Sequence, residues 1–536
     1  MSMADKTQAK SAAGGAPLRP VRLGSPDFLL DARPDGSIHV RSPHKLEAYP
    51  DKITERLVHW AAVVPDRVFI AQRRASGEWR TLTYSETLAQ VQGIAQALLD
   101  RKLSAERPVA ILSGNDIEHA LLALAAMYVG IPYAPISVPY SLMSADFGKL
   151  KSIMEILTPG LVYASDGAMF ARAIDAAVPD EAEAVTAFNP PSFRPITLFS
   201  DLIVTEPTAR VEAAHAAVGP DTVAKILFTS GSTGQPKGAM HSFERITAAA
   251  QGIVGQMNRT LGDQRSHRML SYLPLAHVFE RAFVECAAFV HGRLHVFFAE
   301  SLDTFVQDLQ RARPTIFISV PRLWLKFQQG VFAKLPAPKL SLLLSIPVLN
   351  GVIKKKVLSS LGLDQVELAG SGSAPLPPEL IRWYRRLGLN LVEGYAMTED
   401  FAYSHSQTAH QNDPGTVGPP YPGVQVRISP EGEVLIKSPG QMVGYYKRPD
   451  LDAQSFTTDG FFKTGDLGSR LPDGQLKITG RLKEQFKTSK GKYVAPAPIE
   501  NKINAHPMIE LSMVSGSGFD MAYGLVVLAE HLRPQM

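Results

Sequence analysis

Residues 226–240, ILFTSGSTGQPKGAM, place small, hydroxyl-bearing and basic side chains directly after an apolar run. Small residues let backbone N–H groups approach phosphate oxygens, hydroxyls add donors, and a lysine supplies a mobile positive charge. The pattern therefore predicts a phosphate-binding loop. Its candidate ligands are Thr229, Ser230, Gly231, Ser232, Thr233, Gly234 and Lys237.

This segment differs from the loop of P-loop NTPases. A Walker A loop requires Gly-Lys followed by Ser or Thr, whereas here Pro236 precedes Lys237 and Gly238 follows it. We therefore exclude that class. A flexible Ser/Gly surface loop would have a similar composition, so the choice between the two depends on the rest of the chain.

Three further motifs follow in order: VEGYAMTED at 392–400, FKTGDLG at 462–468 and ITGRLKEQFKTSKGKYVAP at 478–496. With the loop they resemble the adenylate-forming superfamily of acyl-CoA synthetases, peptide-synthetase adenylation domains and luciferases. The resemblance covers roughly residues 50–530. Four motifs in the expected order are far more specific than a single glycine-rich match.

The resemblance implies a site for MgATP, in which the segment from Thr229 to Lys237 grips the β- and γ-phosphates. Thr398 would reach the α-phosphate, and Glu399 would hold Mg²⁺, which prefers hard oxygen ligands. The remaining implied contacts are Gly372, Ser373 and Ala374 beside the adenine, Glu393 and Gly394 along the nucleotide, Tyr395 stacked on the base, and Asp466 and Arg481 on the ribose.

Each implied ligand also has an ordinary structural alternative. Tyr395 could be a core residue, Glu399 a solvated carboxylate and Asp466 a turn residue. Together, however, an aromatic platform, two carboxylates and a cationic loop meet the requirements of bound MgATP, which favours the functional interpretation.

The implied reaction is attack of a carboxylate on the α-phosphorus of ATP, giving acyl-AMP and pyrophosphate, followed by thiolysis with CoA. Lys237, Thr398 and Mg²⁺ would neutralise the developing charge. His277, in SYLPLAHVFERAF, resembles the family histidine beside the reacting carboxylate, although a structural histidine at a strand end is a competing interpretation. Lys483 matches the pivot of the C-terminal lobe.

The resemblance leaves the acid open between two classes. PLAHVFER, PRLWLKFQQGV at 321–331, SGSAPLPPEL at 371–380 and KTSKGKYVAP are most similar to long-chain fatty acyl-CoA synthetases. The segment at 21–67 is instead similar to feruloyl-CoA synthases, which act on aromatic acids. We therefore expect a fatty or aryl acid.

Alternating helix and strand patterns predict an α/β fold around these motifs. A strand-like TLTY precedes helical spacing at 88–98, and strands at 108–112 and 133–136 flank a helical pattern that ends at Gly130. This βαβ unit implies a parallel sheet. Further parallel strands are predicted near 160 and at 225–230, 315–321 and 389–395, and an antiparallel hairpin is predicted after 415, in VQVRISPEGEVLIKS.

The predicted organisation has three parts: a disordered tail at 1–20, an N-terminal adenylate-forming domain at 21–480 with a small β subdomain at about 415–480, and an α+β C-terminal lobe at 481–536. The resemblance implies a C-terminal lobe of about a hundred residues or more, a normal size for a small domain. Because the family's late catalytic lysine has no match here, we expect this lobe to be incomplete. Lys487 and Lys492 could partly substitute for that lysine.

Composition is ordinary for a large soluble enzyme, with 45% hydrophobic and 20% charged residues. A net charge of +4 gives little support for a nucleic-acid partner. The single cysteine, Cys286, suits a reducing compartment, so we expect a cytoplasmic protein.

The most apolar stretch, residues 340–362, is interrupted by Pro347, Asn350 and Gly351, which argues against a membrane span. A buried helix pair is the first interpretation. Weak peripheral attachment to the inner face of a membrane is the second, through the apolar face and Lys354, Lys355 and Lys356.

Three functions stay open at this point. The first is a CoA ligase that uses ATP, Mg²⁺ and CoA as co-substrate. The second is an adenylating module that passes acyl-AMP to a carrier protein or reductase. The third is a nucleotide and acyl binder with impaired catalysis. Nothing in the sequence indicates an oligomeric state.

Overall fold

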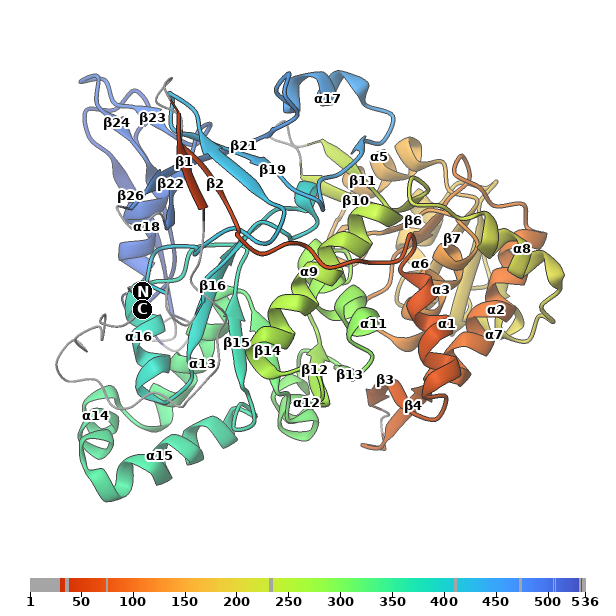
Figure 1. Ribbon diagram of the computed structural model, residues 1–536, viewed down its shortest axis with the longest axis horizontal. Helices are drawn as coiled ribbons and strands as arrows, with labels where there is room; N and C mark the ends of the chain where they lie inside the picture. The colour runs from red at the N-terminus through yellow and green to blue at the C-terminus, as the bar shows by residue number, and fades with distance from the viewer. Residues whose placement is uncertain are drawn as a thin grey trace, which may run out of the picture.

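The computed structural model describes residues 29–33, 38–73, 76–230, 235–408, 412–471, 475–504, 506, 508–529 and 532. The tail predicted at 1–20 and Gly231, Ser232, Thr233 and Gly234 of the phosphate loop lie outside the described residues. The predicted α/β fold is confirmed: a body of sheets and helices carries an antiparallel sheet and a small C-terminal unit at one end (Figure 1).

The largest sheet has eight strands in the order β20-β11-β10-β6-β5-β7-β8-β9. The strands from β10 to β9 are parallel, as predicted, and β11 and β20 add an antiparallel edge. Their bounds are β5 (Val109–Ile111), β6 (Tyr133–Pro135), β7 (Leu161–Asp166), β8 (Glu183–Phe188), β9 (Ile196–Leu198), β10 (Val223–Ser230), β11 (Pro236–Ser242) and β20 (Gly444–Tyr445).

Helix ends around this sheet follow local sequence signals. Thr83 and Glu86 form a capping box at the start of α2 (Tyr84–Asp100), and Asp116 caps α3 (Ile117–Tyr128). Gly130, with φ of 73°, follows α3 and allows the chain to turn into β6. The other helices of this part are α1 (Thr54–Val63), α4 (Pro139–Leu142), α5 (Gly148–Leu157), α6 (Ala171–Ala177), α7 (Phe199–Ile203) and α8 (Ala209–Ala217).

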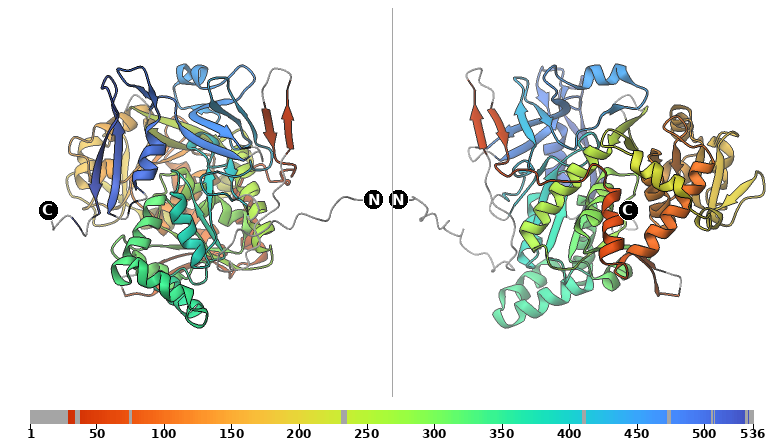
Figure 2. Two further views of the ribbon diagram at one scale, coloured as in Figure 1. Left: turned by 90° about the vertical axis from the view of Figure 1, so that its left-hand side faces the viewer. Right: turned by 45° about the vertical axis from the view of Figure 1, so that its right-hand side comes forward.

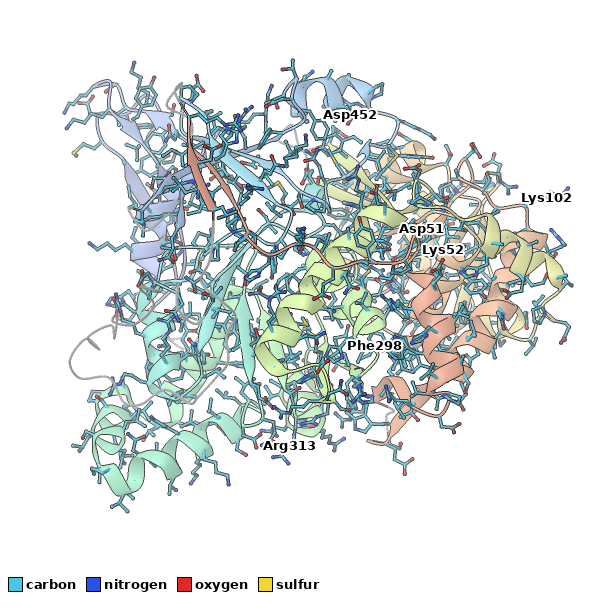
Figure 3. All side chains as sticks on the ribbon, in the orientation of Figure 1. Asp51, Lys52, Lys102, Phe298, Arg313 and Asp452 are labelled. Atoms are coloured by element: carbon cyan, nitrogen blue, oxygen red, sulfur yellow. The ribbon has the colours of Figure 1, made fainter. Side chains whose placement is uncertain are left out.

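Lys52, just before α1, shows how this core accommodates a buried charge (Figure 3). Its side chain is 7% exposed, and its ammonium donates to Val218 O at 3.1 Å and to His215 O, where α8 ends. The negative end of a helix dipole favours a cation at this place.

Two four-stranded sheets complete the body, in the orders β12-β13-β3-β4 and β14-β15-β16-β17. The strands predicted at 315–321 and 389–395 lie in the second of these, as parallel neighbours of β15. The bounds are β3 (Val68–Arg73), β4 (Trp79–Thr83), β12 (His267–Ser271), β13 (Leu294–Phe298), β14 (Ile316–Ser319), β15 (Leu368–Ser371), β16 (Leu391–Tyr395) and β17 (His405–Ser406).

Helix α9 (Phe243–Leu261) crosses the centre of the body. Gly252 on this helix faces Tyr403 so closely that a Cβ atom would lie 1.9 Å from the tyrosine hydroxyl, so only glycine fits. The other helices of this part are α10 (Val278–Glu280), the π-helix η1 (Arg281–Cys286), α11 (Ala287–His291), α12 (Phe305–Ala312), α13 (Pro321–Lys334) and α16 (Pro378–Arg386).

The predicted hairpin after residue 415 is confirmed as β18 (Gln425–Ile428) and β19 (Glu433–Lys437). Its six-stranded sheet has the order β1-β2-β18-β19-β21-β22, so the β subdomain includes an N-terminal hairpin that the predicted range of 415–480 leaves out (Figure 2). The remaining bounds are β1 (Leu29–Ala32), β2 (Ile38–Arg41), η2 (Thr398–Asp400), α17 (Pro449–Ser455), β21 (Phe462–Arg470) and β22 (Leu476–Arg481).

The C-terminal part contains two short sheets and a helix. These are β23 (Phe486–Lys487), β24 (Tyr493–Val494), α18 (Pro496–Asn504), β25 (Ile509–Ser515) and β26 (Tyr523–Leu528). Arg322 of α13 pairs with Glu510 of β25 at 2.7 Å and connects this part to the body.

The apolar stretch at 340–362 forms two helices, α14 (Ala337–Ser345) and α15 (Pro347–Ser360). The predicted helix pair is confirmed, but its predicted burial is wrong for one face. Leu344 and Val357 pack inward, whereas Leu342 and Val352 are each 64% exposed and Val348 is 84% exposed. In the part of the chain that the structure describes, no helix is long and apolar enough to cross a bilayer.

Candidate active site

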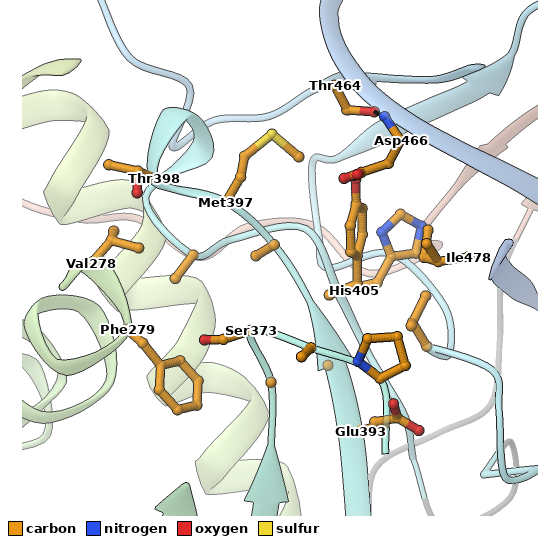
Figure 4. A pocket seen from close by; sticks show the side chains of 18 of the residues that line it. Val278, Phe279, Ser373, Glu393, Met397, Thr398, His405, Thr464, Asp466 and Ile478 are labelled. Atoms are coloured by element: carbon orange, nitrogen blue, oxygen red, sulfur yellow. Dashed lines mark hydrogen bonds between the residues drawn. The ribbon is translucent and has the colours of Figure 1, made fainter. Parts of the chain in front are cut away.

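A cavity of about 1630 Å³ lies between α9, the ends of β15 and β16, and the hairpin of β21 and β22. Figure 4 shows Val278 and Phe279 on one side, Asp466 and Ile478 on the other, and Ser373 and Glu393 below. Ligand pockets commonly measure about 300–1,000 Å³. The space therefore suffices for a nucleotide together with a second substrate.

The first polar group in the cavity is formed by Lys237, Glu399 and Tyr445. Lys237 Nζ lies 3.0 Å from Glu399 Oε1 and also donates to the hydroxyl of Tyr445. That hydroxyl donates to the same carboxylate oxygen at 2.7 Å, and the ammonium lies 4.2 Å from the tyrosine ring centroid. A cation and an anion are thus held together at the edge of the largest sheet.

The backbone explains why Lys237 reaches this position. β10 and β11 form a hairpin in which Thr229 pairs with Lys237 and Ser230 with Pro236. Both ends of the predicted loop are therefore strand residues. Thr229 lines the cavity, and its buried hydroxyl has no hydrogen-bond partner among the described residues.

The second polar group lies at the start of the β21–β22 hairpin. Asp466 and Arg481 are direct cross-strand partners, with Arg481 Nε 3.2 Å from Asp466 Oδ1. The Tyr395 hydroxyl donates to Asp466 Oδ2 at 2.7 Å. Burial raises the pKa of Asp466, and the bonds from Tyr395 and Arg481 partly offset this effect. Asp466 thus contacts both of the other residues that the sequence assigns to base and ribose.

Gly372, Ser373 and Ala374 follow β15 and line the same cavity. Ser373 adopts a left-handed conformation, with φ of 70°. Glu393 holds this segment, because its Oε1 accepts the Leu376 N–H at 2.8 Å.

The Glu393 side chain is 3% exposed, and burial raises its pKa to about 7. It therefore acts first as a structural acceptor for the predicted adenine segment. The neighbouring Gly394 is tightly packed, since an added Cβ would lie 3.2 Å from His405 O.

His277 caps α10, with its Nδ1 accepting the Phe279 N–H at 3.3 Å. The side chain is exposed to the cavity, and the surrounding protein lowers its pKa through desolvation. The ring is therefore neutral at pH 7 and presents Nε2–H away from the helix.

Two side chains hold the loop that carries His277. Asn115 accepts the Leu275 N–H at 3.0 Å and donates to Leu273 O at 2.7 Å. Arg281 donates to Leu275 O at 2.5 Å. The position of His277 thus depends on residues from two separate segments.

Arg281 belongs to a buried charge cluster below this loop. It bonds Glu285 at 2.6 Å and His119 Nε2 at 2.5 Å, and Lys225 lies 3.6 Å from Glu285. Burial would raise the pKa of Glu285, but Arg281 and Lys225 bring it down to about 2. The carboxylate stays ionised and anchors the cluster.

Neither Tyr445 nor Arg281 is among the site residues predicted from the sequence. Tyr445 is 208 residues from Lys237 and meets it because β20 pairs with β11. A two-residue strand gives no periodic signal. Arg281 could have been noticed, because the largely apolar run HVFERAFVECAAFV contains this charge together with Glu280 and Glu285, and buried charges are usually paired.

The other end of the cavity is apolar. Ile253 and Met257 of α9 line it together with Phe279, Phe283 and Ile318. The rings of Phe279 and Phe283 lie 5.1 Å apart. This end suits an uncharged substrate tail.

Lys483, the predicted pivot, lines the cavity beside Arg481. Lys487 and Lys492 are exposed and do not line it. The structure therefore does not bring either lysine to the site where the sequence analysis expected a substitute for the missing catalytic lysine.

The residues present fit the implied magnesium ion. Glu399 is a partly buried carboxylate in the cavity, beside the predicted phosphate segment. Mg²⁺ is usually held by one or two carboxylates together with substrate phosphates and water. One carboxylate at this place therefore satisfies the requirement.

Comparison with known proteins agrees with this geometry. The profile of the AMP-binding enzyme family matches residues 57–446. The chain belongs to this family. The predicted membership of the adenylate-forming superfamily is thereby confirmed.

Relatives within the family include long-chain fatty acid CoA ligases. FadD15 from Mycobacterium tuberculosis, named a long-chain-fatty-acid–CoA ligase, is 30% identical over 494 residues, which cover 87% of this chain and 80% of the relative. Human long-chain-fatty-acid–CoA ligase 1 is 34% identical over 311 residues, or 53% of this chain and 44% of the relative.

A solved structure gives the same fold. The A domain of the carboxylic acid reductase from Segniliparus rugosus, in complex with AMP and a co-purified carboxylic acid, superposes with a TM-score of 0.74 at 23% identity. The match covers 90% of this chain and 83% of that chain.

Proposed function

We propose that this AMP-binding enzyme converts a fatty or aryl carboxylic acid, ATP and CoA into acyl-CoA, AMP and pyrophosphate. The observation that carries the proposal is the single cavity with two unlike ends. The Lys237–Glu399 pair and the Asp466 cluster occupy one end, and apolar side chains occupy the other.

In the first half-reaction a carboxylate oxygen forms a bond to the α-phosphorus, and the bond from that phosphorus to pyrophosphate breaks. Lys237 and Thr398 counter the charge on the phosphoryl oxygens, and Mg²⁺ held by Glu399 supplies further positive charge when bound. Tyr395, Asp466 and Arg481 hold the nucleoside, which fixes the direction of attack.

His277 lines the cavity and is neutral, so it can donate a hydrogen bond to the acid without repelling Lys237. In the second half-reaction the CoA thiol loses its proton, its sulfur bonds to the acyl carbon, and AMP leaves. We infer that Lys483 acts as the pivot that admits CoA between the two steps.

The cytoplasm supplies ATP and CoA, and the proposal places the enzyme there, where it meets its acid at the inner face of the membrane. The buried free thiol of Cys286 agrees with a reducing compartment.

The test is incubation of the chain with MgATP and octanoate, palmitate, benzoate or ferulate, with and without CoA. Release of AMP and pyrophosphate together with an acyl-CoA, identified by mass spectrometry, is the expected result. Pyrophosphate with acyl-AMP but no thioester would instead favour an adenylating module. Binding of MgATP without turnover of any acid would contradict the proposal.

A further inference from the structure

We propose that the tip of the α14–α15 hairpin is a docking surface for anionic lipid bilayers. The hairpin projects from the body at the lower left of Figure 1 and at the lower edge of both views in Figure 2. It forms no part of the cavity.

The tip is apolar where it is exposed. Val348 is 84% exposed, Leu342 and Val352 are each 64% exposed, and Ile346 and Leu349 are about two-fifths exposed. Single exposed apolar residues are common on soluble proteins, but here five lie within eleven residues around the turn between the two helices. Inner residues such as Leu344 and Leu358 already provide the packing that holds the hairpin to the body.

Basic side chains stand behind this tip. Residues 337–360 contain four lysines and no acidic residue. Lys355 and Lys356 are exposed, and Arg386 of α16 reaches the hairpin by donating to Ser341 Oγ at 3.0 Å. The surface is therefore positively charged, which complements an anionic leaflet.

The order of the two kinds of side chain along α15 favours a membrane over a protein partner. Val348, Val352 and Lys355 follow helical spacing and share one face of the helix. At 1.5 Å per residue, Lys355 lies about 10 Å behind Val348 along the axis. A hairpin that enters the bilayer tip first would bury Val348 below the headgroups and keep Lys355 behind it, at headgroup level.

This inference rests on the proposed function in one respect. A fatty acid substrate partitions into bilayers, which gives the enzyme a reason to contact the membrane. Binding itself can be measured without turnover. A failure of the membrane proposal would appear as a lack of vesicle binding. A failure of the proposed function would appear as a lack of activity on water-soluble octanoate, so the two outcomes can be distinguished.

The experiment is co-sedimentation of the full chain with vesicles of phosphatidylcholine alone or of an equal mixture with phosphatidylglycerol. We expect partition into the anionic vesicles, weakened by added salt. One lysine near an anionic surface contributes about fivefold to binding, so Lys355→Glu/Lys356→Glu should reduce partition by more than tenfold. Lys149→Glu/Lys151→Glu, at two exposed lysines on α5, is the charge-matched control.

The apolar contribution is tested by Val348→Asp/Val352→Asp. Its control is Val204→Asp, at a valine that is 77% exposed far from the hairpin. We expect the double variant to lose vesicle binding, whereas the control retains it and both keep wild-type activity on octanoate. Equal partition of the double variant and the control, or no partition of the wild type, would overturn the proposal. Self-association of the wild type that the double variant abolishes, without vesicle binding, would overturn it in favour of a contact between copies of the chain.

Discussion

The two ends of the cavity are built in different ways. At the polar end, charged and aromatic side chains meet in pairs with defined geometry, such as Lys237 with Glu399 and Asp466 with Arg481. At the apolar end, Met257, Phe279 and Phe283 define a shape without any directional bond. Binding at the polar end therefore requires particular residue types, whereas binding at the apolar end requires side chains of a suitable volume.

This difference explains which part of the site the sequence could predict. Asp466 and Lys237 are expected from their motifs because a particular chemistry needs a particular side chain. The depth of the apolar end depends on the distance across the cavity between α9 and the strands β14 and β15, and no local pattern encodes that distance. The choice between fatty and aryl acids therefore stays a prediction.

The largest expected effect concerns the polar end. Lys237→Met should lower kcat for adenylation about 10²- to 10³-fold, because one preorganised donor to a developing charge contributes about that much. Pyrophosphate release measures the effect. Lys437→Met is the control, since Lys437 lies on the β subdomain and bonds Asp459 O instead. Similar rates in the two variants would remove Lys237 from the mechanism.

Asp466→Asn should weaken MgATP binding about tenfold to a hundredfold, because hydrogen bonds to a charged group contribute about 1.5–3 kcal/mol. Isothermal titration calorimetry measures the dissociation constant. The matched control is Asp459→Asn, which breaks the exposed pair with Arg427 in the same sheet. An unchanged affinity in Asp466→Asn would show that this carboxylate does not bind the ribose.

His277→Ala tests the one histidine proposed to contact the acid. We expect kcat to fall roughly tenfold or more, since the variant loses one positioned hydrogen-bond donor. The affinity for MgATP should change little. A variant with wild-type turnover would leave His277 as only the cap of α10.

Substitutions at the apolar end should change substrate choice and leave the chemistry intact. Met257→Phe narrows the space and should lower kcat/KM for palmitate about tenfold relative to octanoate. Phe283→Ala widens it and should shift preference the other way. Equal losses for both acids would mean that these residues stabilise the fold without selecting the acid.

The smallest effect concerns Glu393, whose pKa burial raises to about 7. The folded state then binds a proton that the unfolded state has already released, so this group lowers stability as pH rises from about 4.5 to 7. Glu393→Gln keeps the acceptor for Leu376 N–H and removes the titration. Between pH 5 and pH 7.5, the Tm of this variant should decrease by about 2 °C less than the Tm of the wild type. Parallel curves for the two proteins would contradict the assignment.

The fold was predictable where periodicity is strong. Helices α2 and α3 and the parallel strands around them follow from apolar spacing and from caps such as Asp116. The positions of Tyr445 and of the N-terminal hairpin were not predictable, because their partners are hundreds of residues away in the sequence. For α15 the sequence left two interpretations open, a buried helix and an exposed apolar face, since an apolar sequence does not show which side has a partner.

The N-terminal hairpin has a consequence for synthesis on the ribosome. β2 pairs with β18, where Val40 faces Val426. At about 5–20 residues per second, β2 waits roughly 20 to 80 s after its own translation before this partner emerges. During that time one edge of the hairpin has open hydrogen-bonding groups, and Leu29 and Leu30 lie on the neighbouring strand. Protection of this nascent edge by a chaperone would therefore raise the yield of folded chain.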